Sequence, residues 1–322
     1  MNFRTILHTE YDIHIDKKVK LKYDRSIPEK SVKVSKQKDS FVFKGDIERP
    51  QIVSVVILIL LADYYFHIED FPEFQINMKF KNEYKKKQHK HVSNILGPCE
   101  DIKHIEKAFI PYYVCLSKTY LKFPYENIQK SIDWLRDHCY KMKIKHKKAV
   151  WRGCVMSLER FDLLQLAESN KDVLDVQPTG YETKKLHINH HYVKKRIKQD
   201  NFMPFQDFSR YKYIIDCQSM HGPHKMSHSG RLFWEFHMNR VLFIPTDASS
   251  LWFQIKEPHP EPYIHYIPYE YTNMSTIIRD INWLEQNPIE YEKIKSNCFE
   301  FSRKYLMMNN VLKDVKKILN NV

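Results

Sequence analysis

The clearest structural signal in this chain is KAVWRGCVMSLERFDLLQLAESN, residues 148–170. The short segment KAVWRG predicts a strand, and Gly153 is expected to open the turn that follows it. The next segment, SLERFDLLQLAESN, has the spacing of an amphipathic helix with Ser157 as its N-cap. A strand that leads directly into a helix is the first half of a βαβ unit.

The alternation of strands and helices continues to the end of the chain. Further strands are predicted in VLDVQPT, RYKYIIDCQ, RVLFIPTD and YIHYIPY. Further helices are predicted in SHSGRLFWEFHMN, MSTIIRDINWLEQN, IEYEKIKSNCFEFSRKYL and NNVLKDVKKILN. Because strands that alternate with helices form a parallel sheet covered on both faces, we expect the α/β class.

The first half of the chain has a weaker α/β pattern. FVFKG at 41–45 predicts a short strand, and the apolar run at 52–62 fits either a helix or a strand. YYFHIED predicts a strand that stops at the bend forced by Pro72. A helix is predicted from residue 126, with one face formed by Ile128, Ile132, Leu135 and Tyr140. We therefore expect two α/β domains, joined near residues 143–149.

Composition and charge narrow the class of protein. With 43% hydrophobic and 28% charged residues, the chain is typical of a soluble globular protein. The net charge is +13, and lysine runs such as KMKIKHKK form either solvated surfaces or a surface that attracts nucleic acid or a nucleotide. No signal-peptide pattern is present, the apolar run at 52–62 is too short to span a bilayer, and the six cysteines form no CxxC. We expect a cytoplasmic protein with reduced thiols.

Three stretches are expected at the carboxyl ends of strands, where parallel α/β sheets bind their ligands: EDFP, WRGCVMSLER and the loop that enters SGRLF. In the second stretch Arg152 follows a strand, Gly153 opens the turn and Arg160 lies in the next helix. Arg152 and Arg160 could bind a phosphate group. The alternative for Arg160 is an ion pair with a surface carboxylate such as Asp162 or Glu168.

The stretch SHSGRLF combines the groups that a diphosphate needs. Ser227 and Ser229 supply hydroxyl donors, Gly230 lets the backbone approach closely, and Arg231 can form paired hydrogen bonds with phosphate oxygens. The start of a helix adds unpaired N–H groups and the positive end of its dipole. The alternative is ordinary N-capping, with Arg231 turned to solvent.

Asp70 is the candidate general base, because a carboxylate held beside the bend at Pro72 could accept a proton from a hydroxyl. The alternative is a turn aspartate that caps its own backbone. The histidine-rich stretches HINHHY and HGPHKMSH have no carboxylate or cysteine at zinc spacing, and HExxH is absent, so no metal site is expected. No P-loop, GxGxxG or DxD motif is present.

In order along the chain, DYYFHIEDFPEF, AVWRGCVMSLERFDLL, RYKYIIDCQ, SHSGRLFWEFHMNRVLFIP, PYIHYIP and NCFEFSRKYL resemble glycosyltransferase family 90. This family holds the Rumi-like protein O-glucosyltransferases and the fungal capsule-associated xylosyltransferases. The resemblance implies a GT-B architecture, with two Rossmann-like domains facing across a cleft and C-terminal helices that pack back toward the N-terminal domain. The expected parts are an acceptor-side domain at 1–145, a UDP-sugar-binding domain at 146–300 and closing helices at 301–322.

The resemblance also implies roles for individual residues. Asp70 matches the family's catalytic aspartate, and Arg152 and Arg231 match its diphosphate-binding arginines, while Arg160 matches the arginine of its E-R pair. The implied donor site also includes Gly153, Ser227, Ser229 and Gly230. At three positions the chain departs from the family's pattern: Glu69, Cys154, and the segment at Tyr263 and Ile264 where the family often has a tryptophan.

The implied reaction is inverting transfer of a sugar, xylose before glucose, from a UDP-sugar to a hydroxyl of a glycan or glycoprotein acceptor. A cytosolic bacterial or viral glycan pathway would suit it. No tightly bound cofactor is implied, and loosely bound Mn²⁺ or Mg²⁺ is left open. The alternative is a non-catalytic, basic nucleic-acid-binding protein. A transferase needs Arg152, Arg160 and Arg231 in one cleft facing Asp70, whereas a nucleic-acid binder needs its lysine runs along one face.

Overall fold

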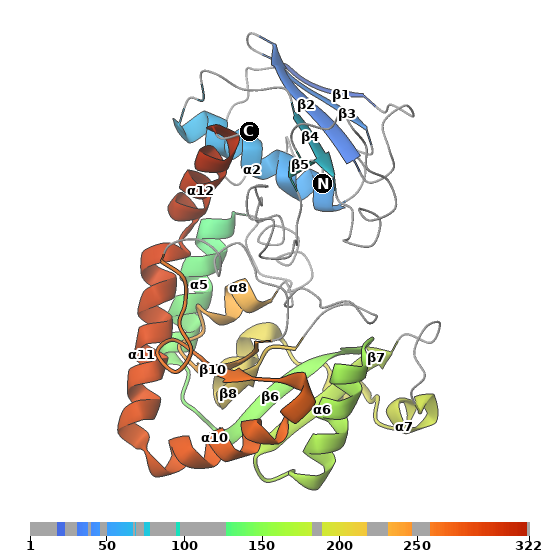
Figure 1. Cartoon of the computed structure of the whole chain (residues 1–322), viewed down its shortest axis with the longest axis vertical. Helices are drawn as coiled ribbons and strands as arrows, with labels where there is room; N and C mark the ends of the chain where they lie inside the picture. The colour runs from blue at the N-terminus through green and yellow to red at the C-terminus, as the bar shows by residue number, and fades with distance from the viewer. Residues whose placement is uncertain are drawn as a thin grey trace. The chain divides into compact units, whose positions relative to one another are not determined.

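The structure of the full chain is a computed structural model (Figure 1). It describes residues 18–22, 31–37, 40–45, 50–66, 68, 74–77, 95–96, 127–181, 189–217, 231–246 and 258–320. The chain divides into two compact units, which are Met1–Ser131 together with Met307–Val322, and Ile132–Leu306. These divisions differ from the expected ones at 145 and 300.

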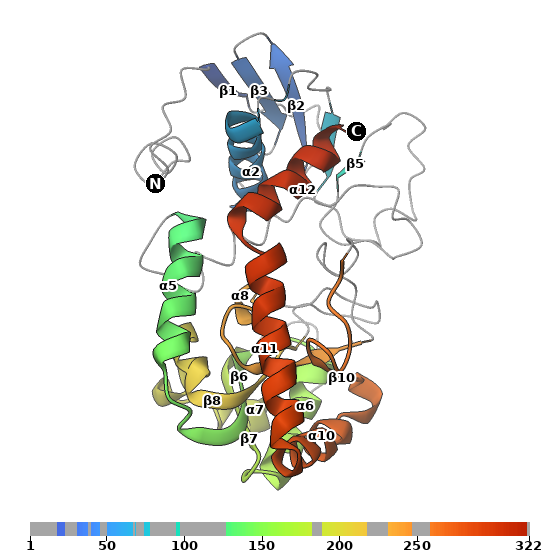
Figure 2. The same cartoon turned by 90° about the vertical axis from the view of Figure 1, so that its left-hand side faces the viewer.

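The contacts of α5 (Ile128–Lys141) explain why the first division falls inside this helix. Arg136 of α5 donates hydrogen bonds to the Ser302 hydroxyl at 2.7 Å and to the Phe299 carbonyl at 3.5 Å, both on α11 (Pro288–Tyr305). Its guanidinium also lies 3.8 Å from the centre of the Phe299 ring. Most of α5 therefore belongs with α11 rather than with the residues before it, and Figure 2 shows the two helices.

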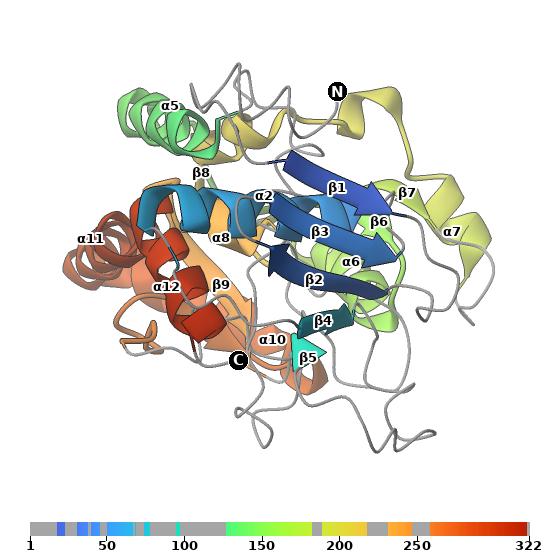
Figure 3. The same cartoon turned by 90° about the horizontal axis from the view of Figure 1, so that it is seen from above.

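The N-terminal unit contains a five-stranded mixed sheet in the order β1-β3-β2-β4-β5, which Figure 3 shows from above. Its strands are β1 (Lys18–Lys22), β2 (Ser31–Gln37), β3 (Ser40–Gly45), β4 (Phe74–Asn77) and β5 (Ile95–Leu96). β2 runs antiparallel to both β3 and β4, whereas the β1–β3 and β4–β5 pairs are parallel. The strand predicted at 41–45 is confirmed as part of β3.

The apolar run at 52–62 is a helix, α2 (Pro50–Phe66), whose residues from Val56 to Ala62 are all buried. The strand predicted over YYFHIED is wrong for its first part, because α2 continues through Phe66. The last helix, α12 (Met308–Asn320), packs on α2, and Lys316 donates to the Phe66 carbonyl at 3.5 Å. This contact confirms that the C-terminal end of the chain returns to the N-terminal unit.

The second unit is built on a five-stranded sheet in the order β10-β9-β8-β6-β7, in which every neighbouring pair is parallel. Its strands are β6 (His146–Val155), β7 (Leu174–Tyr181), β8 (Tyr211–Ile215), β9 (Val241–Pro245) and β10 (Ile267–Tyr269). Its other helices are α6 (Leu158–Ser169), α7 (His190–Lys194), α8 (Leu232–Glu235) and α10 (Ser275–Gln286), with short 3₁₀ turns at Gln199–Asn201, Phe205–Arg210 and Tyr271–Asn273. The expected α/β class is confirmed.

The strand order places a topological switch point between β6 and β8. β6 pairs with β7 on one side and with β8 on the other, and the sheet then continues outward through β9 and β10. In open α/β sheets, ligands bind at such a point, outside the carboxyl ends of the two strands. The core beside it combines buried side chains of the central strands with Leu163 and Leu164 of α6, Ile277 and Ile281 of α10, and Ile294 of α11.

Two local predictions are wrong. Tyr140 was expected on the buried face of α5 but is 71% exposed, and Cys139 takes that place beside Leu135 because the helical spacing puts position 139 on the inner face. In YIHYIPY only Ile267–Tyr269 is a strand. The residues before it form a tight turn in which Tyr263 has φ 57° and donates from its N–H to the Tyr266 carbonyl at 2.7 Å.

Candidate active site

Arg160 occupies the switch point. It lies in the first turn of α6, which Ser157 caps by accepting from the Arg160 N–H at 3.3 Å. Its guanidinium donates to the Cys154 carbonyl on β6 at 2.8 Å and to the Cys217 carbonyl just past β8 at 3.2 Å. The side chain is buried, and its Nε has no hydrogen-bond partner in the described part of the chain. Arg160 thus joins the carboxyl ends of both strands and keeps a free donor there.

The surface-pairing alternative for Arg160 is wrong. Glu168 instead accepts hydrogen bonds from Tyr192 and Arg196 at the periphery. Burial lowers the pKa of the Arg160 guanidinium, and the positive charge of Arg231 lowers it further. An arginine remains charged even so, which makes Arg160 a buried cation suited to an anionic ligand.

Gly153 does not open a turn. It lies inside β6, at a register shift with β7 between Gly153 and Cys154. A Cβ atom at this position would come within 2.7 Å of Cζ2 of Trp151, so the indole lies directly against the glycine. The Arg160 guanidinium in turn lies 5.5 Å from the centre of the Trp151 ring. Gly153 therefore makes room for the aromatic ring that supports Arg160.

Arg231 approaches the same strand from the start of α8. One of its terminal nitrogens donates to the Arg152 carbonyl on β6 at 2.5 Å, and its guanidinium lies 5.6 Å from the Phe208 ring. Its side chain is only 19% exposed, so the solvent-facing alternative is wrong. α8 spans only four residues, and a helix of one turn has little dipole. The positive charge at the start of α8 therefore comes from the Arg231 side chain and not from the helix dipole.

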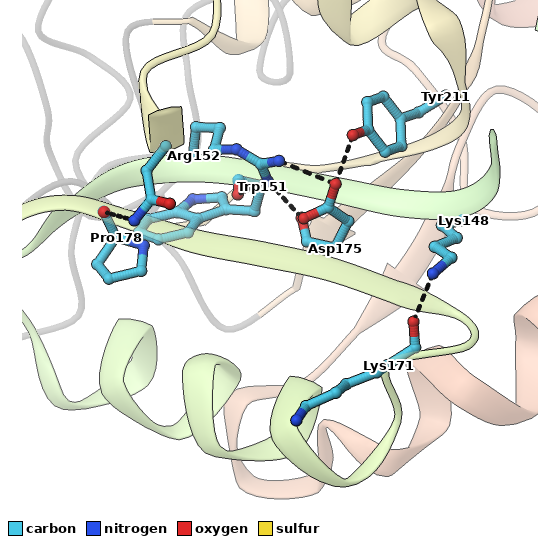
Figure 4. A network of polar contacts seen from close by, with 8 residues as sticks. Lys148, Trp151, Arg152, Lys171, Asp175, Pro178 and Tyr211 are labelled. Atoms are coloured by element: carbon cyan, nitrogen blue, oxygen red, sulfur yellow. Dashed lines mark hydrogen bonds and ion pairs between the residues drawn. The ribbon is translucent and has the colours of Figure 1, made fainter. Parts of the chain in front are cut away.

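The guanidinium of Arg152 is not directed to this edge. It forms an ion pair with Asp175 of β7 at 2.9 Å, and it also donates to the main-chain carbonyls of Asp175 and Trp151 at 2.7 and 3.0 Å (Figure 4). The Tyr211 hydroxyl donates to the same Asp175 carboxylate. Burial opposes ionisation of Asp175, but these hydrogen bonds hold its pKa below the ordinary value. Arg152 faces the site with its main-chain carbonyl, which binds Arg231.

Two carboxylates that the sequence analysis did not single out lie beside the arginines. Asp216 follows β8 directly, and Glu235 ends α8; both are fully buried. Glu235 is 3.7 Å from Nε of Arg231. A carboxylate directly after the apolar strand RYKYII could have drawn attention to Asp216, since it stands at a strand end. Glu235 gave no such signal, because LFWEF reads as the inner face of a helix.

Several expected site residues lie outside the described residues. These are Asp70 with its neighbour Glu69, and the donor-side residues Ser227, Ser229 and Gly230. Their proposed roles stay predictions. Among the residues that the structure does describe, Arg160 and Arg231 meet at one strand edge.

Metal-ligating side chains, cysteines and apolar helices also bear on the expectations from the sequence. In the described ranges, no three histidine, cysteine or acidic side chains gather as a metal site. Cys139, Cys154, Cys217 and Cys298 are free thiols, while Cys99 and Cys115 lie outside the described residues. None of the described helices is long and apolar enough to cross a membrane.

A parallel sheet whose switch point holds two largely buried arginines is suited to binding a phosphate-bearing ligand. Comparison with protein families agrees: residues 49–321 match Glycosyl transferase family 90. The match covers most of the sequence, and the chain belongs to this family. The resemblance recognised from the sequence is thereby confirmed.

Individual relatives are distant. Protein O-glucosyltransferase 2 of Danio rerio is 28% identical over 167 residues, which are 52% of this chain and 30% of the relative. Protein O-glucosyltransferase 3 of Homo sapiens is 25% identical over 150 residues, 47% of this chain and 26% of the relative. The matched segment spans less than a third of either protein. The C-terminal domain of a glycosyl transferase group 1 family protein from Francisella tularensis is 13% identical, over 58% of this chain and 97% of that domain, with a TM-score of 0.33.

Proposed function

We propose that this chain transfers a sugar from a UDP-sugar to a hydroxyl of a glycan or glycoprotein acceptor with inversion at the anomeric carbon. The observation that carries the proposal is the pair of largely buried cations, Arg160 and Arg231, at the carboxyl ends of β6 and β8. A UDP leaving group gains negative charge as the glycosidic bond breaks. Preorganised cations at that position stabilise the charge more strongly than water does.

Arg160 and Arg231 would have different roles in binding the diphosphate. Arg160 is held by two carbonyls and a tryptophan ring and cannot move far, so it would bind the diphosphate without reorganising. Arg231 is bound to one carbonyl and keeps other donors for paired hydrogen bonds with phosphate oxygens. Arg152 would act through its carbonyl, by positioning Arg231. Asp70 would take the proton from the acceptor hydroxyl.

Two donor sugars, xylose and glucose, enter the test. Xylose was the first expectation from the family. The names of both relatives refer to glucose, so we propose glucose and xylose as equal candidates for the donor sugar. The transfer chemistry at the arginines is the same for both.

Titration calorimetry tests the proposal with UDP, UDP-glucose and UDP-xylose, and with a short nucleic-acid duplex as the competing ligand. A charge-assisted hydrogen bond contributes about 1.5–3 kcal/mol, so Arg231→Ala should weaken UDP binding by roughly 10- to 150-fold. Arg231→Lys should restore only part, because lysine cannot form the paired bonds. The matched control is Arg303→Ala, an exposed arginine paired with Glu300 on α11.

Two results would contradict the proposal. UDP affinity that is equal in wild type and Arg231→Ala would remove the diphosphate role. Tight binding of the duplex without any binding of UDP would favour the nucleic-acid alternative. For that alternative the relevant groups are Lys143, Lys145 and Lys147, which are exposed at the amino end of β6, the opposite end of the strand from Arg160.

A further inference from the structure

Glu235 is in an unusual position for a carboxyl group. Its side chain is 0% exposed, and neither carboxylate oxygen has a hydrogen-bond partner among the described residues. The nearest described cation is Arg231, whose Nε lies 3.7 Å from one oxygen, beyond hydrogen-bond distance. Glu235 therefore has a long ion pair with Arg231 but accepts no hydrogen bond from the described residues, which is rare for a fully buried carboxylate.

The surroundings of Glu235 oppose its negative charge. Burial raises its pKa well above the ordinary value, the charge of Asp216 raises it further, and Arg231 acts in the opposite direction. Among the described residues, the charged groups that face it are Asp216 from the end of β8 and Arg231 from the start of α8. Arg160 lies one step further away, near both of them. With all four ionised, two cations face two carboxylates and the charges cancel.

We propose that Glu235 is a positioning residue that takes up a proton when a diphosphate binds to Arg231, so that donor binding and protonation of Glu235 are linked. The inference rests on the proposed function. While Glu235 is ionised it attracts the Arg231 guanidinium and repels an incoming phosphate. Once it is neutral, Arg231 directs its whole charge to the ligand.

The direction of the linkage follows from the charges. The bridging diphosphate of a nucleotide sugar carries one negative charge on each phosphate, and bringing it close to an ionised Glu235 costs Coulomb energy in a buried site. Binding therefore raises the proton affinity of Glu235. At a pH above that at which free Glu235 ionises, each bound ligand brings a proton with it, and affinity should fall by up to about tenfold per pH unit.

The test uses UDP-glucose, because its diphosphate does not titrate near neutral pH whereas the terminal phosphate of UDP does. Calorimetry from about pH 5.5 to about pH 8.5, in buffers with different heats of ionisation, counts the protons taken up on binding. Wild type should take up as much as about one proton at the upper end of that range and lose affinity with rising pH. Glu235→Gln, which has the same shape and no charge, should take up none and bind equally at every pH. The matched control is Glu300→Gln on α11, an exposed carboxylate that should leave the wild-type behaviour intact.

Three results would overturn the proposal. They are binding by wild type without proton uptake anywhere in the range, unchanged uptake in Glu235→Gln, and loss of uptake in Glu300→Gln. Glu235→Leu is the second variant should Glu235→Gln fail to fold, because removing a buried carboxyl that accepts no hydrogen bond from the described residues need not destabilise the fold. A purely structural role for Glu235 would shift the melting temperature and leave the slope of affinity against pH unchanged. Failure of the proposed function is distinct: wild type would then not bind UDP-glucose at any pH.

Discussion

Substitution of Gly153 by alanine probes the support beneath Arg160. A Cβ atom at position 153 would lie 2.7 Å from Cζ2 and 3.1 Å from Cη2 of Trp151, and both distances are shorter than an ordinary van der Waals contact. The indole is fully buried and belongs to the core of the second unit, so it has no open space into which to move. Either the strand or the ring must shift.

The expected cost is that of overpacking a core, about 1–3 kcal/mol. For a unit of this size, 1 kcal/mol lowers the melting temperature by roughly 2–4 °C, so Gly153→Ala should melt about 2–12 °C below wild type. Because the Arg160 guanidinium lies 5.5 Å from the same ring, UDP affinity should fall as well.

The chain offers a matched control in Gly180 on β7. A Cβ atom there would lie 3.5 Å from Sγ of Cys154, an ordinary contact, so the free energy of unfolding of Gly180→Ala should lie within about 1 kcal/mol of that of wild type. Calorimetry of both variants, with UDP titration on the same preparations, decides the matter. Equal melting temperatures for the two variants would refute the packing argument, and a destabilised Gly153→Ala with normal UDP affinity would separate Trp151 from the site.

Three further outcomes are expected. Asp70→Asn should lower turnover by about 10²–10⁴-fold with UDP affinity unchanged, and near-normal turnover would remove it as the base. Because the pKa of Asp175 is lowered in the fold, its ionised carboxylate should stabilise the protein above about pH 4, and this stabilisation should fade as the pH falls further. Melting temperatures of Asp175→Asn measured against pH should lack this acid-dependent loss. A loss equal to that of wild type would contradict the role of Asp175. Burial raises the pKa of the Cys139 and Cys217 thiols to about 12. Both thiols should therefore resist a thiol reagent at pH 8 in the native protein and react after denaturation. Fast reaction in the native protein would contradict their burial.

The sequence was most informative where periodicity and position along a strand decide the structure. The strand and helix of residues 148–170 are present as β6 and α6, with Ser157 as the cap. The convergence of Arg160 and Arg231 could be anticipated, because parallel strands bring their carboxyl ends to one edge whatever their order. The order itself, with β6 between β7 and β8, came only from the structure, since hydrophobic patterns do not encode which strands pair.

Sequence reasoning failed where side chains compete. Arg152 and Arg160 looked equivalent, yet Arg160 lies on α6, whereas Arg152 lies on β6 and turns to a carboxylate on the neighbouring strand. Asp175 was the unforeseen partner. Gly153 read as a turn residue, whereas its purpose is to leave space for the ring two residues earlier on the same face. Such contacts between neighbouring strands depend on register, which the sequence does not show.

Glu235 is the case in which a local rule was broken. Its neighbours are apolar and it sits on the inner side of a short helix, where a leucine would satisfy every rule of packing. A buried carboxyl that accepts no hydrogen bond from the described residues lowers stability. Because Glu235 lies beside two cations at a strand edge, we relate its presence to the ligand that those cations bind. Its charge matters only when Arg231 is engaged, because the guanidinium is the one described cation within 4 Å of it. A ligand that engages the charge of Arg231 leaves Glu235 without the opposing charge that the described residues provide, and the carboxyl then binds a proton instead.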